Sequence, residues 1–403
     1  MKRQQTISLL LLLLMITPCL KAQKKELSQA RSYIKSGKDY DKAEKLMTDL
    51  LETDSTNRTN EKIYLTWFQV VTKQYEMANE KLYLKQQYDT AAFFNLTRRL
   101  YSIAETLDTL DAMPDEKGRV RLDYRKSHAA LLNQLRPNLY SGGVYYLRKD
   151  DNLMAYDFFK TYIDAAEKPL FTGYDYANTD EERMAESAYW AEYAGYKMQD
   201  AERTLCYFDL AVTDTARAKF AIQYASEAYR WQQNIPAYVE TLKRGFESYP
   251  DYAYFFPRLI DYYNEQERPD SALYYANKAL EKVPDMELFL LAKSLALLNL
   301  ERYDECIEVS ERLIARNDSL AEPYFNIATA KLNQVLALEK NDQARANRQK
   351  IQRLYMEARP YMEAYRNLAP DEKNKWAPAL YRIYFNLNMG RQFEEIDKVM
   401  KAL

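Results

Sequence analysis

The side chains best suited to catalysis are few and scattered. His128 is the only histidine and lies in RKSHAALLNQL, a segment with helical spacing, where it could act as a general base or a metal ligand. Carboxylates occur side by side at 180–182 and 394–395, but consecutive helix positions do not face each other. The sequence contains no phosphate-binding glycine loop, dinucleotide-binding glycine motif or nucleophile elbow. We therefore interpret His128 as a packed or solvated side chain and predict no enzyme activity.

The composition also limits metal and nucleic-acid chemistry. One His and three Cys in 403 residues cannot supply a multi-His zinc site or a four-thiolate cluster, so we predict no metal and no cofactor. We interpret Cys206 and Cys306 as small buried thiols, with a disulfide between them as the alternative. The 57 Lys and Arg residues nearly balance the 59 Asp and Glu residues, so no overall basic character favours nucleic acid as a partner.

The first 22 residues have the pattern of a secretory signal peptide. Lys2 and Arg3 precede the apolar run ISLLLLLLMI, which is too short to cross ~30 Å of hydrocarbon as a helix. We predict cleavage near Ala22 and export to the periplasm or cell surface. The alternative is a lipid anchor at Cys19, although Pro18 stands where that pattern has a small residue. No later segment reaches ~18 consecutive apolar residues, so no transmembrane segment is predicted.

A repeat of about 34 residues organises the rest of the chain. Pro250 closes the stretch FESYPD, and Pro284 closes LEKVPD 34 residues later. The Leu and Tyr residues recur every three or four positions and do not alternate, which predicts helices and no strands. Only 8 glycines are available for tight turns, which disfavours β-hairpins.

The spacing of small and large side chains resembles that of the tetratricopeptide repeat (TPR) family. In that family two antiparallel helices cross closely at small residues, and the neighbouring repeat fills the groove with large ones. Clear units begin at Arg136, Lys219, Ala253 and Glu287, and their small positions include Gly143, Ala155, Ala272 and Ala279. The resemblance covers most of residues 24–403. It implies an all-α, right-handed superhelical solenoid of antiparallel helix pairs.

The predicted organisation is a signal peptide (1–22), N-terminal helical repeats (23–111) and a main solenoid (121–403). The loop at 112–120, with Pro and Gly, is the expected boundary between the two groups of repeats. A basic insertion near 338–354 is expected to lengthen one helix pair. Within 185–212, Glu192 stands where the pattern has a small residue, which leaves the register of that unit open.

The resemblance also implies a binding surface, because the first helix of each TPR unit lines a concave face. The residues predicted there are Tyr140, Arg148, Tyr189, Tyr193, Tyr196, Lys197, Arg230, Trp231 and Tyr254. Aromatic residues beside Arg and Lys are the types that contribute most binding energy in interfaces. The alternative is that the tyrosines only pack the helices together. The Lys and Asn residues with which some TPR proteins hold chaperone tails are not at the corresponding positions.

Together these features predict a non-catalytic, exported scaffold that binds a protein or extended peptide on its concave face. The alternative function is binding of a glycan or envelope polymer, with Tyr189, Tyr193 and Trp231 stacking on sugar rings. Triplets such as Asp214-Thr215-Ala216 are either helix caps or sites of O-glycosylation.

Overall fold

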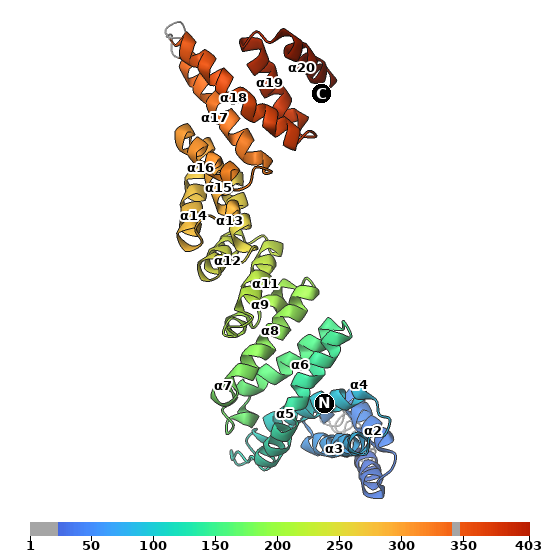
Figure 1. Cartoon of the computed structure of the whole chain (residues 1–403). Helices are drawn as coiled ribbons and strands as arrows, with labels where there is room; N and C mark the ends of the chain where they lie inside the picture. Colours follow the sequence, from blue (N-terminus) through green and yellow to red (C-terminus); the bar gives the residue numbers. More distant parts are fainter. Residues whose placement is uncertain (1–22, 341–346) are drawn as a thin grey trace, which may run out of the picture. The chain divides into compact units, whose positions relative to one another are not determined.

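The computed structural model describes residues 23–340 and 347–403, and helices are the only regular secondary structure among them (Figure 1). The predicted signal peptide and residues 341–346 of the basic insertion lie outside these residues. Residues 23–36 form the first helix. The later α-helices are α2 (Tyr40–Thr53), α3 (Glu61–Tyr83), α4 (Thr90–Asp111), α5 (Arg125–Arg148), α6 (Asn152–Asp164), α7 (Tyr176–Thr179), α8 (Glu181–Lys197), α9 (Ala201–Leu205), α10 (Phe208–Ala211), α11 (Ala218–Trp231), α12 (Ile235–Ser248), α13 (Phe255–Glu265), α14 (Pro269–Lys282), α15 (Glu287–Asn299), α16 (Tyr303–Arg316), α17 (Ala321–Lys340), α18 (Arg348–Leu368), α19 (Lys373–Asn386) and α20 (Gly390–Ala402).

Consecutive helices pack as pairs, and each pair packs against the next. Helix α5 packs against α6 and α6 against α8, and in the same way α14, α15, α16 and α17 contact one another in sequence order. This arrangement confirms the predicted all-α, TPR-like fold. None of the helices in the described part of the chain is long and apolar enough to span a membrane.

The turns between paired helices repeat with the predicted period. Gln199, Gln233, Glu267 and Glu301 follow α8, α11, α13 and α15, and each has a positive φ between 51° and 58°. Successive members are 34 residues apart. A left-handed residue ends a helix and reverses the chain, a position that glycine usually takes. This chain uses polar residues there instead, at a conformational cost of about 1 kcal/mol each.

Aspartates begin several of the second helices. The side chains of Asp89, Asp151 and Asp200 each accept a hydrogen bond from the backbone N–H three residues later, at 3.0–3.1 Å. An N-cap of this kind satisfies one of the free N–H groups in the first turn of a helix and contributes ~1 kcal/mol. The left-handed residue and the capping aspartate therefore fix where each helix pair turns.

Small side chains lie at the helix crossings, as the TPR resemblance implies. A Cβ atom placed on Gly143 would come within 2.6 Å of the Phe159 ring, and Ala155 and Ala272 are fully buried. In the unit at 185–212 the small residue at the crossing is Gly195, whose Cβ would lie 2.5 Å from the backbone N of Thr204. The placement of Glu192 at the small position was therefore wrong by three residues.

The contacts divide the chain into two compact units, Met1–Tyr238 and Val239–Leu403, which are called unit 1 and unit 2 below. The loop at 112–120, where the sequence suggests a boundary, lies within unit 1, and α4 and α5 on either side of it pack against each other. In unit 2, α17 and α18 are 20 and 21 residues long, whereas α15 and α16 are 13 and 14. The additional residues near 338–354 thus lengthen this helix pair.

Candidate functional site

All the predicted binding residues except Tyr254 lie in unit 1, on α5, α8 and α11. Tyr254 precedes α13 in unit 2 and is buried, and Tyr189 on α8 is buried as well. Tyr140, Tyr193, Tyr196 and Trp231 are half-buried, whereas Arg148, Lys197 and Arg230 are exposed. Tyr189 and Tyr254 therefore contribute mainly to the core, and the other predicted residues have surface that a partner could contact.

Five aromatic rings form a continuous row between α8 and α11, which we call the aromatic seam: Trp190, Tyr193, Tyr196, Tyr224 and Trp231. Tyr196 stacks on Tyr224 at a centroid distance of 4.4 Å and on Trp231 at 5.6 Å, with interplanar angles of 26° and 22°. Tyr193 contacts Tyr224 at 5.8 Å and meets Trp190 edge-on, also at 5.8 Å. All five rings are half-buried, so the seam is both packed and accessible.

Helical spacing brings these rings together. Tyr189, Tyr193 and Tyr196 are four and three residues apart on α8, and Tyr224 and Trp231 are seven apart on α11, so each set lies along one face of its helix. Because α8 and α11 pack against each other, the two sets meet. The sequence analysis missed Trp190 and Tyr224, although the seven-residue spacing from Tyr224 to Trp231 could have identified the latter.

Arginines connect the seam to α5. The Arg183 guanidinium lies 4.2 Å from the centroid of the Tyr140 ring and donates to Glu186 at 2.7 Å. Arg217 also pairs with Glu186, at 3.1 Å, and lies 5.6 Å from the Trp190 ring. Cation–π contacts of this kind hold both the ring and the guanidinium in place. The network therefore fixes the relative positions of the side chains on α5, α8 and the start of α11.

Burial and mutual hydrogen bonding keep the seam uncharged. Burial is the main cause that raises the pKa of the Tyr224 phenol, and a hydrogen bond with Tyr189 raises it further. Positive charge lies beside the seam on exposed Lys197 and on Arg230, which pairs with Glu227 at 2.5 Å. The surface is thus a neutral aromatic strip with cations at one end of each helix.

One carboxyl group near the seam is buried without a partner. Glu192 on α8 is fully buried, and neither of its carboxyl oxygens has a hydrogen-bond partner within the described residues. Burial raises the pKa of this carboxyl well above its usual range, so it is protonated at neutral pH.

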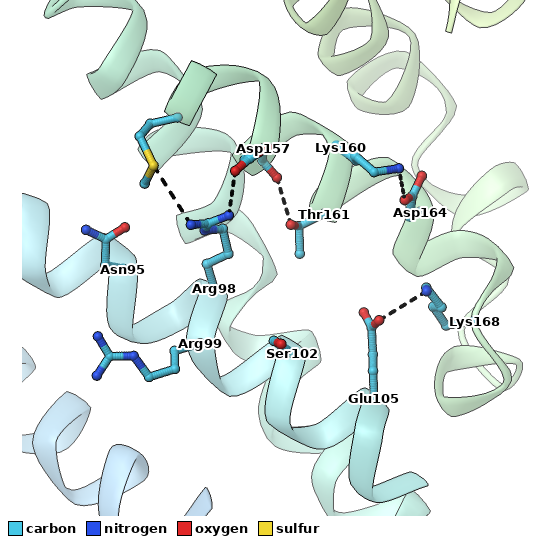
Figure 2. A pocket seen from close by; sticks show the side chains of 11 residues that line it. Asn95, Arg98, Arg99, Ser102, Glu105, Asp157, Lys160, Thr161, Asp164 and Lys168 are labelled. Atoms are coloured by element: carbon cyan, nitrogen blue, oxygen red, sulfur yellow. Dashed lines mark hydrogen bonds and ion pairs between the residues drawn. The ribbon is translucent and has the colours of Figure 1, made fainter. Parts of the chain in front are cut away.

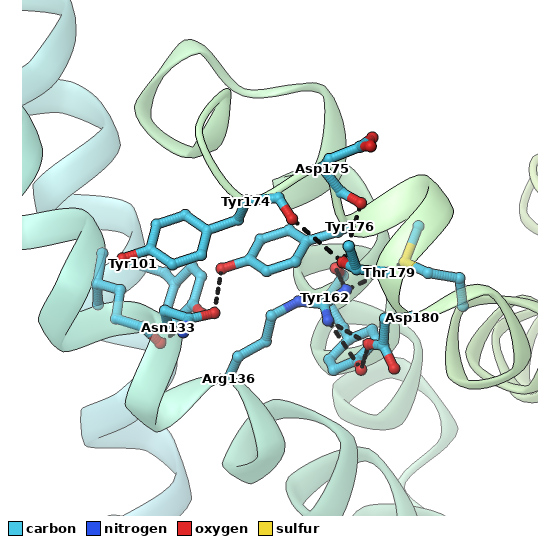
Figure 3. A network of polar contacts seen from close by, with 11 residues as sticks. Tyr101, Asn133, Arg136, Tyr162, Tyr174, Asp175, Tyr176, Thr179 and Asp180 are labelled. Carbon is cyan, nitrogen blue, oxygen red and sulfur yellow. Dashed lines mark hydrogen bonds and ion pairs between the residues drawn. The ribbon is translucent and has the colours of Figure 1, made fainter.

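A second network attaches the irregular segment before α8 to α5 and α6 (Figure 3). The buried Arg136 guanidinium lies between the rings of Tyr162 and Tyr176, 3.7 and 3.9 Å from their centroids. Arg136 and the Tyr162 hydroxyl both donate to Asp180, and the Tyr176 hydroxyl donates to Asn133 at 2.9 Å. These contacts from α5 to α7 have a structural role, because both faces of the guanidinium are covered.

The residues considered for catalysis and redox chemistry are dispersed. His128 packs against Phe68 and Tyr124, at centroid distances of 4.2 and 5.7 Å, and burial lowers the pKa of its imidazole. Cys306 is buried as predicted, but Cys206 is exposed at the break between α9 and α10, and both thiols are free. Within the described residues no group of three or more His, Cys, Asp or Glu side chains could hold a metal ion.

Comparison with known proteins shows likeness in fold only. No protein-family model and no curated protein matches the chain. The C-terminal part of a TPR repeat-containing protein from Cytophaga hutchinsonii is 11% identical, with 66% of this chain and 95% of that chain covered and a TM-score of 0.43. Yeast Tom70 is 13% identical, with 95% and 99% covered and a TM-score of 0.35. The complex of the TPR2AB domain of yeast Sti1 with pHSP90 is 14% identical, with 74% and 98% covered and a TM-score of 0.26. The assignment of a TPR-like fold rests on the helix pairs and crossings described above.

Proposed function

We propose that this chain is a non-catalytic, exported scaffold that binds a protein partner through an extended peptide segment on the α5, α8 and α11 face of unit 1. The aromatic seam is the observation that carries the proposal. Its rings are already stacked, so binding would immobilise few side chains and lose little conformational entropy. Exposed Lys197 and Arg230 would add polar contacts at the edge.

The geometry of the seam favours a peptide over a glycan. An aromatic side chain that binds a sugar by stacking needs a free ring face, but Tyr196 stacks on both Tyr224 and Trp231. A peptide can instead place apolar side chains against the ring edges and hydrogen-bond its backbone to the phenol hydroxyls. Glycan binding stays a separate outcome of the experiment below.

Site-specific crosslinking tests the binding face. A photoreactive phenylalanine at position 231 should crosslink a partner in native cells, and Tyr196→Ala should reduce that yield strongly because it removes the centre of the stack. The same label at Tyr83, which is 85% exposed on α3, is the control. Equal yields from positions 231 and 83 would contradict the proposal. Saturable binding to a glycan array with no crosslinked protein would favour the glycan function.

Export is tested separately from binding. Fractionation of native cells followed by N-terminal sequencing should yield a protein that begins near Gln23, outside the cytoplasm. A mature protein that begins at a lipid-modified Cys19 would support the anchored alternative, and an intact Met1 in the cytoplasm would refute export.

A further inference from the structure

A polar cavity of about 630 Å³ lies between α4 and α6, at a site in unit 1 that does not include the aromatic seam (Figure 2). The side chains that line it recur every three or four positions on each helix, so each helix contributes one face. The lining residues used here are Arg98, Ser102 and Glu105 on α4, Asp157 and Thr161 on α6, and Lys168 after α6.

Two ion pairs join the walls of this cavity, and their polarity is opposite. Arg98 of α4 donates to Asp157 of α6 at 2.9 Å, whereas Glu105 of α4 accepts from Lys168 at 3.1 Å. These four side chains are between 25% and 41% exposed. Solvent screens ion pairs at this exposure, so they contribute little net stability and a charged ligand can replace either partner.

The paired charges determine which ligands are compatible with the cavity. A simple anion that took Arg98 would leave the Asp157 carboxylate unpaired in a partly buried position, which is unfavourable. A simple cation would leave Arg98 unpaired in the same way. A ligand that carries both charges exchanges each pair for an equivalent one, and the Ser102 and Thr161 side chains between the pairs offer it hydroxyl groups.

The dimensions favour a peptide segment over a single amino acid. Arg98 and Glu105 are seven residues apart on α4, which corresponds to about 10 Å at ~1.5 Å per residue. An extended peptide advances ~3.3 Å per residue, so side chains three residues apart span that distance. A cavity of about 630 Å³ also lies within the range of ligand-binding sites, ~300–1,000 Å³.

We propose that this cavity binds a short, extended peptide segment in which an acidic and a basic side chain are three residues apart. The acidic side chain binds Arg98 and the basic side chain binds Glu105, with Ser102 and Thr161 beneath the segment between them. This second binding site is independent of the function proposed for the aromatic seam.

Peptide binding by the full chain tests this assignment. The probe is a fluorescein-labelled, acetylated and amidated hexapeptide, Ala-Glu-Ala-Ala-Lys-Ala, titrated in a fluorescence anisotropy assay. We expect saturable binding that Arg98→Gln weakens about tenfold or more, consistent with the loss of one charged hydrogen bond. Arg148→Gln, an exposed arginine on α5, is the matched control and should leave the affinity unchanged.

A second variant separates binding from folding. Ser102 is exposed on α4, so Ser102→Trp should fill the cavity and abolish binding while the melting temperature stays unchanged. A probe with Gln in place of both Glu and Lys should not bind. Equal affinity for that probe, unchanged affinity in both variants, or complete displacement by free glutamate or lysine would overturn the peptide assignment. Tyr196→Ala in the aromatic seam should have no effect on this assay.

Discussion

Replacing Glu192 by Gln should remove a loss of stability that the protein undergoes as the pH rises. Glu192 is fully buried, and its carboxyl oxygens have no hydrogen-bond partner in the described part of the chain. Burial raises the pKa of this carboxyl well above its ordinary value of 4.5. At a pH above that value the unfolded chain releases the proton, whereas the folded chain keeps it. Folding therefore binds a proton, and stability falls as the pH increases.

The size of the effect follows from proton linkage. One additional proton on the folded state gives a slope of about 1.4 kcal/mol per pH unit, which begins near the unfolded pKa and ends at the folded pKa. Gln has nearly the same shape as protonated Glu but does not titrate. The free energies of unfolding of the two proteins should thus be similar near pH 4.5, and the advantage of Glu192→Gln should grow steadily at higher pH.

Urea unfolding at pH 5, 6, 7 and 8 measures this difference. Repeat arrays can unfold in parts, so hydrogen exchange of the α8 amides should accompany the optical signal. Glu182→Gln is the control, because Glu182 lies exposed on the first turn of the same helix. A difference between Glu192→Gln and the wild type that stays constant from pH 5 to 8 would show that the buried carboxyl is ionised in the folded protein, and would refute the reasoning.

Four further substitutions test the fold by changes in the free energy of unfolding or in hydrogen exchange. Ala272→Arg should destabilise unit 2 by roughly 3 kcal/mol or more, because Ala272 is fully buried on α14; an unchanged melting temperature would contradict the repeat register. Gly195→Ala should cost roughly 1–3 kcal/mol because its Cβ would overlap the α9 backbone, whereas Gly173→Ala, with open space around it, should change stability by less than ~0.5 kcal/mol. Glu301→Gly should stabilise unit 2 by up to about 1 kcal/mol, because it relieves a left-handed backbone; destabilisation would contradict that geometry. Arg136→Gln should accelerate hydrogen exchange in α7, and protection equal to wild type would show that the stacked guanidinium does not anchor that segment.

The fold could be predicted from the sequence because helix crossings constrain side-chain size directly. Two helices approach closely only at small residues, so Ala155, Ala272 and Ala279 recur at fixed spacing and are all fully buried. The turns constrain the chain less strictly. A left-handed residue is required at each one, but Gln233 and Glu267 serve there as glycine would, so glycine counts gave no indication of them.

The candidate site was only partly predictable, because contacts between repeats depend on pairs of residues that one repeat alone does not specify. Tyr193, Tyr196 and Trp231 were found from their positions on the first helices of repeats. The arginines that stack on Tyr140 and Trp190 come from the neighbouring helix in each case, and a repeat pattern contains no information on such pairs. The α4–α6 cavity was missed for the same reason, because its ion pairs join residues that are far apart in sequence.

The error at Glu192 has a further consequence for the seam. The repeat pattern assumes two unbroken helices in each unit, but the second helix after α8 is interrupted between α9 and α10. The close crossing therefore moves to Gly195, one turn along α8, and leaves a large acidic side chain in the core. A buried, unpartnered carboxyl decreases the stability of the helix that carries Tyr193 and Tyr196. We infer that this chain tolerates the destabilisation because stacking of Tyr196 on Tyr224 and Trp231 holds α8 against α11. If so, Tyr196→Ala should destabilise α8 less in a Glu192→Gln background than the sum of independent sites predicts, and a double-mutant cycle would measure that coupling. Strict additivity would show that the seam and the buried carboxyl act independently.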